Sequence, residues 1–162
     1  MIDWSYHSLN EIEQRALRRL AVFSGGWTIE GAEAVIGEDD AIDGLLGLVN
    51  KSLVNVAEQS GAARYRFLET IRQYAVEKLL ESGEAVESRN RHLEYILKLA
   101  GEGKQDILET PRLAWLEQME VEHDNLRAAL EWSSSNNLAK ALELALALGN
   151  FWMLRDYNVE AV

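Results

Sequence analysis

Three side chains have the types and the spacing that could hold a metal ion: Glu120, His123 and Asp124. They lie at positions i, i+3 and i+4, so in a helix they would share one face. A single histidine with two carboxylates and no supporting motif is more typical of a polar network on a helix surface. We therefore predict no metal ion and a structural role for these residues.

A second candidate is the stretch 101–104, Gly-Glu-Gly-Lys, which superficially resembles a phosphate-binding loop. A true loop of this type needs a glycine five residues before the Gly-Lys pair, and a serine or threonine after it to hold magnesium. Those positions are Lys98 and Gln105 here. We predict no cofactor for this chain, and no binding of ATP or ADP.

The sequence does not support nucleophilic catalysis either. The chain contains no cysteine, which excludes a thiolate nucleophile, a thiolate metal site and a disulfide framework. Its three histidines, His7, His92 and His123, are scattered, and no His–carboxylate–Ser arrangement can be located. We predict that the chain is not an enzyme.

Basic side chains are the better candidates for a binding function. Arg15, Arg18 and Arg19 share a face of a predicted helix. The simple interpretation is a solvated helix face. The alternative is a docking patch for an acidic partner domain. The candidate interdomain contacts are Arg15, Arg18, Arg19, Arg64, Arg66 and Arg72.

Changes of hydrophobic period define the elements that position these arginines. Ser8 or Asn10 can cap a first helix, and Thr28 can cap a second one after the pair Gly25–Gly26. Trp27 is expected to fill the core rather than to stack on a ligand. Asp39 or Asp40 can cap a third helix. The apolar residues of the first helix are Ile12, Ala16, Leu17, Leu20 and Phe23.

A hairpin and a fourth helix follow. Residues 52–56 form one expected strand, 58–63 a turn, and Tyr65 and Phe67 alternate with arginines in a second strand. The period then changes to that of a helix, with an apolar stripe of Leu68, Ile71, Ala75 and Leu79. Three helices, a hairpin and a further helix make a winged helix.

The third helix of a DNA-binding winged helix enters the major groove, where it needs donors and cations. Here the expected buried side is Ile42, Leu45, Leu46 and Val49. The expected exposed face is Asp39, Asp40, Asp43, Gly44, Gly47 and Asn50, and Lys51 comes only at the end. Such an acidic face opposes contact with phosphate. A DNA-binding transcription factor domain is therefore retained only as the alternative function.

The composition and net charge of the whole chain also disfavour DNA binding. The chain has 162 residues, 48% of them hydrophobic, and a formal net charge of −11, which repels nucleic acid and anionic membranes. One proline and abundant Leu, Ala and Glu indicate a mainly α fold with a small β-hairpin. No apolar run approaches the length of a membrane span and no signal peptide is evident. We expect a cytoplasmic location.

Four stretches, in chain order, resemble one family. Residues 19–28 are similar to the first helix and turn of the winged-helix domain in signal-transduction ATPases of the STAND class, which is NB-ARC-like. Residues 48–54 resemble its third helix and first wing strand, and residues 64–75 resemble its closing segment. Residues 120–132 resemble the helix that opens the sensor region of the bacterial members, the LuxR-type and antibiotic-pathway regulators.

The resemblance implies an ATPase module before residue 1 and further helical repeats after residue 162. In the family the winged helix packs on the ATPase module and helps to hold the inactive ADP-bound state, while the repeats sense an inducer or partner. Distant plant and animal members place a histidine on the ADP phosphate. The matching stretch here is Phe67, Leu68 and Glu69. Leucine cannot donate a hydrogen bond, so we do not expect that contact.

The C-terminal stretch resembles a tetratricopeptide repeat. Leu148, Gly149, Asn150 and Trp152, followed by residues 156–157 and 161, match its first helix, its turn and the opening of its second helix, with Arg155 in place of the usual turn glycine. Since the chain stops inside the repeat, we expect it to be a fragment whose apolar edge self-associates. The expected protein-binding surface is Leu148, Phe151 and Trp152, and Trp152→Lys should favour the monomer.

Together these features predict a winged-helix domain over residues 1–82 and a helical, tetratricopeptide-like bundle over residues 83–162. The predicted function is a non-catalytic regulatory and interaction module of a signal-transducing ATPase that regulates transcription. It would couple nucleotide state to a helical-repeat sensor. Its expected partners are the ATPase module and the further repeats of its own protein, with self-association, no membrane and no nucleic acid.

Overall fold

The computed structural model describes residues 2–59, 61–102 and 111–160. The chain divides into two compact units, Met1–His92 and Leu93–Val162, and the division falls inside one helix. The domain boundary predicted at Ser82–Gly83 coincides with a break between two helices, where Gly83 has a left-handed φ of +80°. It stays a prediction.

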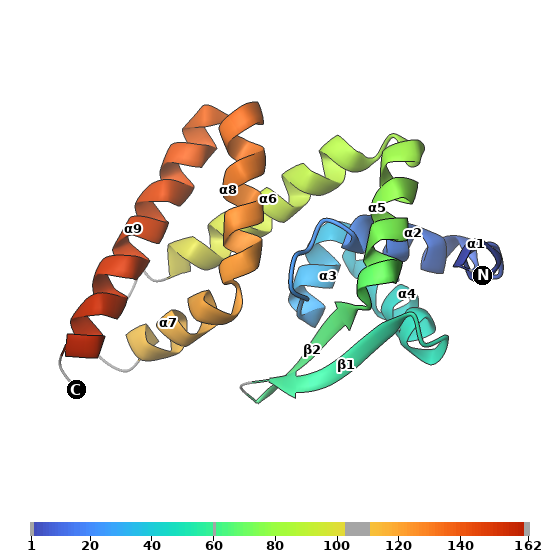
Figure 1. The fold of residues 1–162 in the computed structure, drawn as a ribbon, viewed down its shortest axis with the longest axis horizontal. Coiled ribbons are helices and arrows are strands. Elements are labelled where there is room, and N and C mark those ends of the chain that lie inside the picture. The colour runs from blue at the N-terminus through green and yellow to red at the C-terminus, as the bar shows by residue number, and fades with distance from the viewer. Residues whose placement is uncertain (1, 60, 103–110, 161–162) are drawn as a thin grey trace. The chain divides into compact units, whose positions relative to one another are not determined.

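Unit 1 consists of helices and one hairpin (Figure 1). Its elements are α1 (Ile2–His7), α2 (Glu11–Leu20), α3 (Ile29–Ile36), α4 (Glu38–Asn50), β1 (Val54–Gln59), β2 (Ala62–Phe67), α5 (Glu69–Ser82) and the first part of α6 (Ala85–Gly101). The mainly α fold with a small hairpin is confirmed.

Helix starts show local capping chemistry. The Asn10 side chain accepts a hydrogen bond from the Glu13 N–H at 2.8 Å, and the Glu13 carboxylate accepts one from the Asn10 N–H at 3.2 Å, which completes a capping box for α2. The predicted cap of α3 is confirmed, because Thr28 accepts from the Gly31 N–H at 3.2 Å. The predicted Asp cap of the third helix is wrong: α4 begins earlier, at Glu38, with Gly37 as the preceding residue.

The hairpin is antiparallel, with Val54 opposite Phe67 and Gln59 opposite Ala62. Both strands therefore extend into the residues predicted as the turn, while β1 begins at Val54 and not at residue 52 as predicted. The loop before α3 joins the sheet through two hydrogen bonds of 2.9 Å between the backbones of Trp27 and Tyr65. Gly26 permits this approach, since a Cβ there would lie 2.6 Å from the Tyr65 carbonyl oxygen and its φ is +106°.

Unit 1 has a continuous apolar core. Trp27 is 2% exposed and packs edge-on against Phe67 at 4.9 Å between ring centroids, so its predicted role as a core residue is confirmed. The other large buried side chains of the unit include Leu17, Leu20, Phe23, Val35, Leu45, Leu48, Ile71 and Leu79. The predicted stripe of α5 is correct for Ile71, Ala75 and Leu79. It is wrong for Leu68, which precedes the helix and is half exposed.

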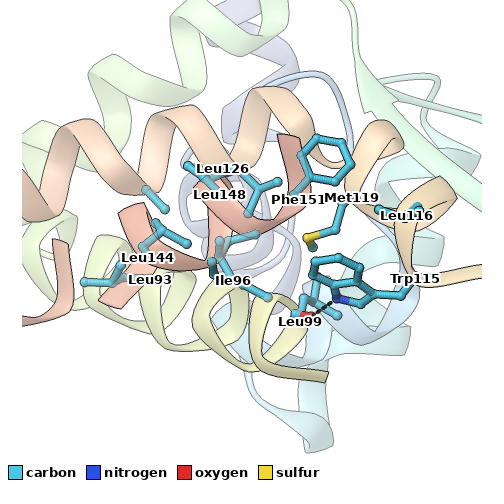
Figure 2. Close-up of a cluster of buried hydrophobic side chains, with 13 residues drawn as sticks. Leu93, Ile96, Leu99, Trp115, Leu116, Met119, Leu126, Leu144, Leu148 and Phe151 are labelled. Atoms are coloured by element: carbon cyan, nitrogen blue, oxygen red, sulfur yellow. Dashed lines mark hydrogen bonds between the residues drawn. The ribbon is translucent and has the colours of Figure 1, made fainter. Parts of the chain in front are cut away.

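Unit 2 contains the rest of α6 with α7 (Pro111–Val121), α8 (His123–Asn136) and α9 (Leu138–Glu160). Figure 2 shows their apolar side chains meeting in one cluster. Its largest members are Leu93, Ile96, Leu99, Trp115, Leu116, Met119, Leu126, Leu144, Leu148 and Phe151. The Trp115 indole N–H donates to the Leu99 carbonyl at 3.0 Å, which satisfies the polar atom of a buried aromatic.

Two expectations for unit 2 are wrong. The helix predicted to continue through residues 120–132 is broken at Glu122, whose carboxylate accepts a 2.8 Å hydrogen bond from the Asn125 side chain. The turn predicted near Arg155 does not form, because α9 continues without interruption to Glu160. Of the helices described, none combines the length and the apolar character needed to cross a bilayer.

Candidate functional site

The helix α4 occupies the third position of the three-helix core, so its outward side is the first surface to consider for binding. We define the outer face of α4 as the exposed residues Asp39, Ile42, Asp43, Leu46 and Asn50. Ile42 is 49% exposed and Leu46 is 51% exposed. Apolar and acidic side chains therefore alternate on a face that offers no cation.

This face differs from the predicted one. Ile42 and Leu46 were expected inside, and Gly44 and Gly47 outside. Glycine explains the rotation, because a Cβ on Gly44 would lie 2.7 Å from the Ala16 Cβ and one on Gly47 would lie 2.5 Å from a Glu13 carboxylate oxygen. The two glycines let α4 approach α2 closely, which turns the larger apolar side chains outward.

The charged side chains of α4 are all acidic. Its first turn contains Glu38, Asp39 and Asp40, and no lysine or arginine occurs between its ends. Lys51 follows the helix, but its ammonium group contacts the Glu13 carboxylate at 2.8 Å. The Glu13 side chain is only 5% exposed, so this lysine neutralises a buried carboxylate of unit 1.

The arginines predicted as interdomain contacts in the wing have intramolecular acceptors. Arg64 is buried and donates to the Gly26 carbonyl at 3.2 Å, while Arg66 donates to the Gly25 carbonyl at 3.2 Å. Arg72, on α5, donates to the Phe23 carbonyl at 3.1 Å. All three hold the loop before α3 against the hairpin and α5.

The arginines of α2 are likewise engaged within unit 1. Arg15 pairs with Asp40 at 3.0 Å. Arg18 and Arg19 both face Glu84, at 3.5 and 3.6 Å. These ion pairs connect α2 to α4 and to the start of α6, so the three side chains help to assemble the unit whether or not they also meet a partner.

Burial and hydrogen bonds shift the pKa of side chains at two positions in unit 1. Burial lowers the pKa of Arg18, but the bond to the Tyr6 hydroxyl at 3.0 Å and the charge of Glu84 raise it by more, so the net direction is upward. Between α1 and α5, burial and a hydrogen bond to Asp3 raise the pKa of Tyr74, and the same bond lowers the pKa of Asp3.

The structure shows other contacts for Glu120 and His123, two of the polar residues considered first. Glu120 pairs with Arg155 at 3.1 Å, and the His123 ring lies 6.5 Å from Phe151 and 6.3 Å from Trp152. Across the described ranges, no group of three His, Asp or Glu side chains is placed to bind a metal. The stretch 101–104 lies partly outside the described residues.

The predicted protein-binding surface is altered by the packing of α9. Leu148 is 2% exposed and Phe151 is 1% exposed, so both belong to the core of unit 2. Trp152 is 48% exposed. The apolar edge predicted from the sequence therefore points inward, and Trp152 is the member that remains available to a partner.

Sequence reasoning missed the close packing of α2 with α4. The signal was present as the pair Gly44 and Gly47, three residues apart in a helix otherwise rich in leucine. Small residues at that spacing share one helix face and allow a close neighbour. By contrast, the ion pair between Glu13 and Lys51 joins residues 38 positions apart and has no local signal.

Comparisons with known proteins found similarity to one family model and to several longer proteins. Residues 9–80 match the family model described as a winged helix-turn-helix domain. The chain is 42% identical, over 171 aligned positions, to "Putative HTH-type transcriptional regulator Mb0914c" of Mycobacterium bovis and to "Putative HTH-type transcriptional regulator Rv0890c" of Mycobacterium tuberculosis. The alignment covers 99% of this chain and 19% of each relative.

A shorter match is 47% identical over 90 residues to "Uncharacterized protein Rv0894" of Mycobacterium tuberculosis, covering 52% of this chain and 23% of that protein. The chain thus spans about a fifth of the length of the curated relatives that it matches over its whole extent. No solved structure matches it.

Proposed function

We propose that this chain, whose residues 9–80 match the model of a winged helix-turn-helix domain, is a non-catalytic regulatory module that contacts protein rather than DNA. It would act within a longer transcriptional regulator. Homology to proteins named as HTH-type transcriptional regulators supports the regulatory role. The outer face of α4 supports the preference for protein.

The observation that carries the proposal is the chemistry of that outer face. A helix that reads DNA presents cations and hydrogen-bond donors to phosphates and base edges. The outer face of α4 presents Asp39 and Asp43 beside the half-exposed Ile42 and Leu46. Carboxylates repel the phosphate backbone. By contrast, covering exposed aliphatic side chains with a protein surface is favourable, because it removes apolar area from water.

The finer part of the proposal concerns the parent protein. By resemblance to STAND-class regulators, the module would couple the nucleotide state of an ATPase module to a helical-repeat sensor. The size of the relatives, about five times this chain, leaves room for both. The full reading frame provides a test: a phosphate-loop motif upstream of this segment is expected, and its absence would contradict the ATPase coupling while leaving the interaction role intact.

DNA binding is the second candidate, and the family match favours it. The test is fluorescence anisotropy of the 162-residue chain with labelled random duplexes, at low and at physiological salt. We expect no binding at physiological salt. Salt-sensitive, sequence-dependent binding by the unmodified chain would overturn our preference.

A charge reversal makes the test sharper. If α4 is shaped to enter a groove and only its charge prevents this, Asp39→Lys with Asp43→Lys should produce salt-dependent DNA binding. A matched control reverses the exposed Glu117 and Glu131 of unit 2 and changes the net charge equally. Equal gains in both double variants would show that net charge alone, and not the face of α4, opposes DNA.

A further inference from the structure

The C-terminal helix α9 has a second apolar side. We define its outer stripe as Leu138, Leu142, Ala145, Leu146, Gly149 and Met153. Its leucines are 67%, 59% and 70% exposed in chain order, and Met153 is 69% exposed. The spacing of three and four residues places all six positions along one side of the helix.

The opposite side of α9 is already buried. Leu144, Leu148 and Phe151 point into the core of unit 2, as Figure 2 shows, with Ala141 and Ala147 beside them. A helix that is apolar on both sides is normally covered on both. The outer stripe therefore has the character of an interface, although the core of unit 2 does not use it.

Charge makes this stripe unusual in a chain with a net charge of −11. None of its six positions is ionisable. Of the nearby charged side chains, Lys140 pairs with Glu94 and Arg155 pairs with Glu120 at 3.1 Å, so both are engaged within unit 2. The exposed acidic residues Glu143 and Asp156 lie beside the stripe and beyond its C-terminal end. Two copies of an acidic chain repel each other over most of their surface, and an uncharged stripe is where they can meet.

The stripe is also complementary to itself. Its positions are symmetric about the midpoint between Ala145 and Leu146, so an antiparallel partner helix would set Leu138 opposite Met153 and Leu142 opposite Gly149. A Cβ on Gly149 would meet no atom within 4 Å, so there is open space in which the leucine of a second copy fits. In the dimer, Leu142 of each copy would therefore lie opposite Gly149 of the other copy, once on each side of the midpoint.

We propose that the outer stripe is a homodimer interface in which α9 of two copies pack antiparallel about that midpoint. A two-fold axis makes such an interface use the same patch twice. Exposed side chains that each lose on the order of 100 Å² would together bury about 1,000 Å², at the lower limit for specific interfaces. The dimer is therefore weak and forms with rising concentration. This proposal is independent of the function proposed for unit 1.

The first test is sedimentation velocity of the 162-residue chain over a concentration series. We expect a monomer–dimer equilibrium that Leu146→Glu weakens at least tenfold, because it sets two carboxylates next to the axis. The matched control is Leu80→Glu, which adds the same charge at a leucine of α5 that is 64% exposed. A chain that stays monomeric throughout, or equal effects of both variants, would overturn the proposal.

Gly149→Leu separates a specific fit from general stickiness. It adds apolar surface, so unspecific association would increase. In the proposed packing it fills the gap that receives Leu142, so the dimer should weaken at least tenfold. Adding Leu142→Ala to Gly149→Leu exchanges large for small across the interface and should restore part of the affinity. Tighter association of the single variant would contradict the antiparallel fit.

Cross-linking tests the direction of the helices, since the chain has no cysteine of its own. Ala145→Cys lies next to the axis, within reach of its copy, and should form an intermolecular disulfide under mild oxidation. Leu138→Cys would lie about 22 Å along the axis from its copy and should not. Cross-linking of Leu138→Cys at the same rate as Ala145→Cys would overturn the antiparallel arrangement.

Discussion

At the scale of single residues, unit 1 depends on charges that are satisfied inside it. Glu13 takes part in the capping box of α2 and is bridged to Lys51, which places a carboxylate in a site that is 5% exposed. An ionised group in such a site is stable only while its partners remain. The lysine that could have served DNA at the end of α4 is thus part of the internal structure.

Lys51→Met is expected to lower the free energy of unfolding by about 1–3 kcal/mol, because it leaves the Glu13 carboxylate without its cation. Denaturant unfolding measures this loss. The control is Lys140→Met, which removes an exposed partner of Glu94 and should cost at most about 1 kcal/mol. Equal costs for both variants would show that Glu13 does not need the lysine.

Tyr74 predicts a dependence on alkaline pH. Burial and the bond to Asp3 raise its pKa in the folded state above the usual value near 10. The unfolded chain then releases this proton first, so the stabilising contribution is complete below pH about 10 and is lost progressively as the pH rises further. Tyr74→Phe should therefore flatten the decline of stability above pH 10, and Asp3→Asn should do so in part. Identical slopes for all three proteins, by thermal unfolding, would refute this.

At the scale of elements, the packing of α4 on α2 decides which side chains meet a partner. Gly44 and Gly47 provide the close contact, and Ile42 and Leu46 are exposed as a result. Glycine in a helix interior normally lowers stability through backbone entropy. Here that loss is offset by the approach of the two helices.

Two glycines in helix interiors should respond to alanine with opposite signs. Gly44→Ala should destabilise the chain by about 1–3 kcal/mol, since the new methyl group would overlap Ala16. Gly149→Ala meets open space and should stabilise by up to about 1 kcal/mol, as helix propensity predicts. Urea unfolding at low protein concentration measures both. Adding Ala16→Gly to Gly44→Ala should recover part of the loss, and a stabilising Gly44→Ala would show that the contact is loose.

At the scale of the whole molecule, each unit has an exposed apolar surface that its own core does not cover. Unit 1 presents an acidic and apolar face on α4, and unit 2 presents an uncharged apolar stripe on α9. Both suit protein partners, and the net charge of −11 opposes polyanions.

The whole chain should bind neither ATP nor ADP. The stretch 101–104 lacks the loop glycine and the hydroxyl residue that phosphate and magnesium require, and Leu68 has no hydrogen-bond donor in its side chain. Isothermal titration calorimetry with magnesium present is the measurement. A saturable micromolar site for either nucleotide would contradict this expectation.

The sequence alone was sufficient for what local interactions determine. The cap at Thr28, the core position of Trp27 and the buried face of α5 beyond Leu68 follow from side-chain period and hydrogen bonding within a few residues. The succession of α2, α3 and α4, the hairpin and α5 was predictable for the same reason, whereas the short helix α1 was not predicted. The sequence also indicated that α4 has acidic side chains where a DNA-binding helix has basic ones.

Only the tertiary structure decided which side of a two-sided helix is buried. Both α4 and α9 have apolar residues around much of their circumference, so period alone cannot select a face. The choice depends on where a neighbouring helix can approach, as α2 does at Gly44, and on which side chains fill the core, as Phe151 does in unit 2. The long-range partners of Glu13 and Arg64 were unpredictable for a related reason: folding brings together atoms that no local pattern connects.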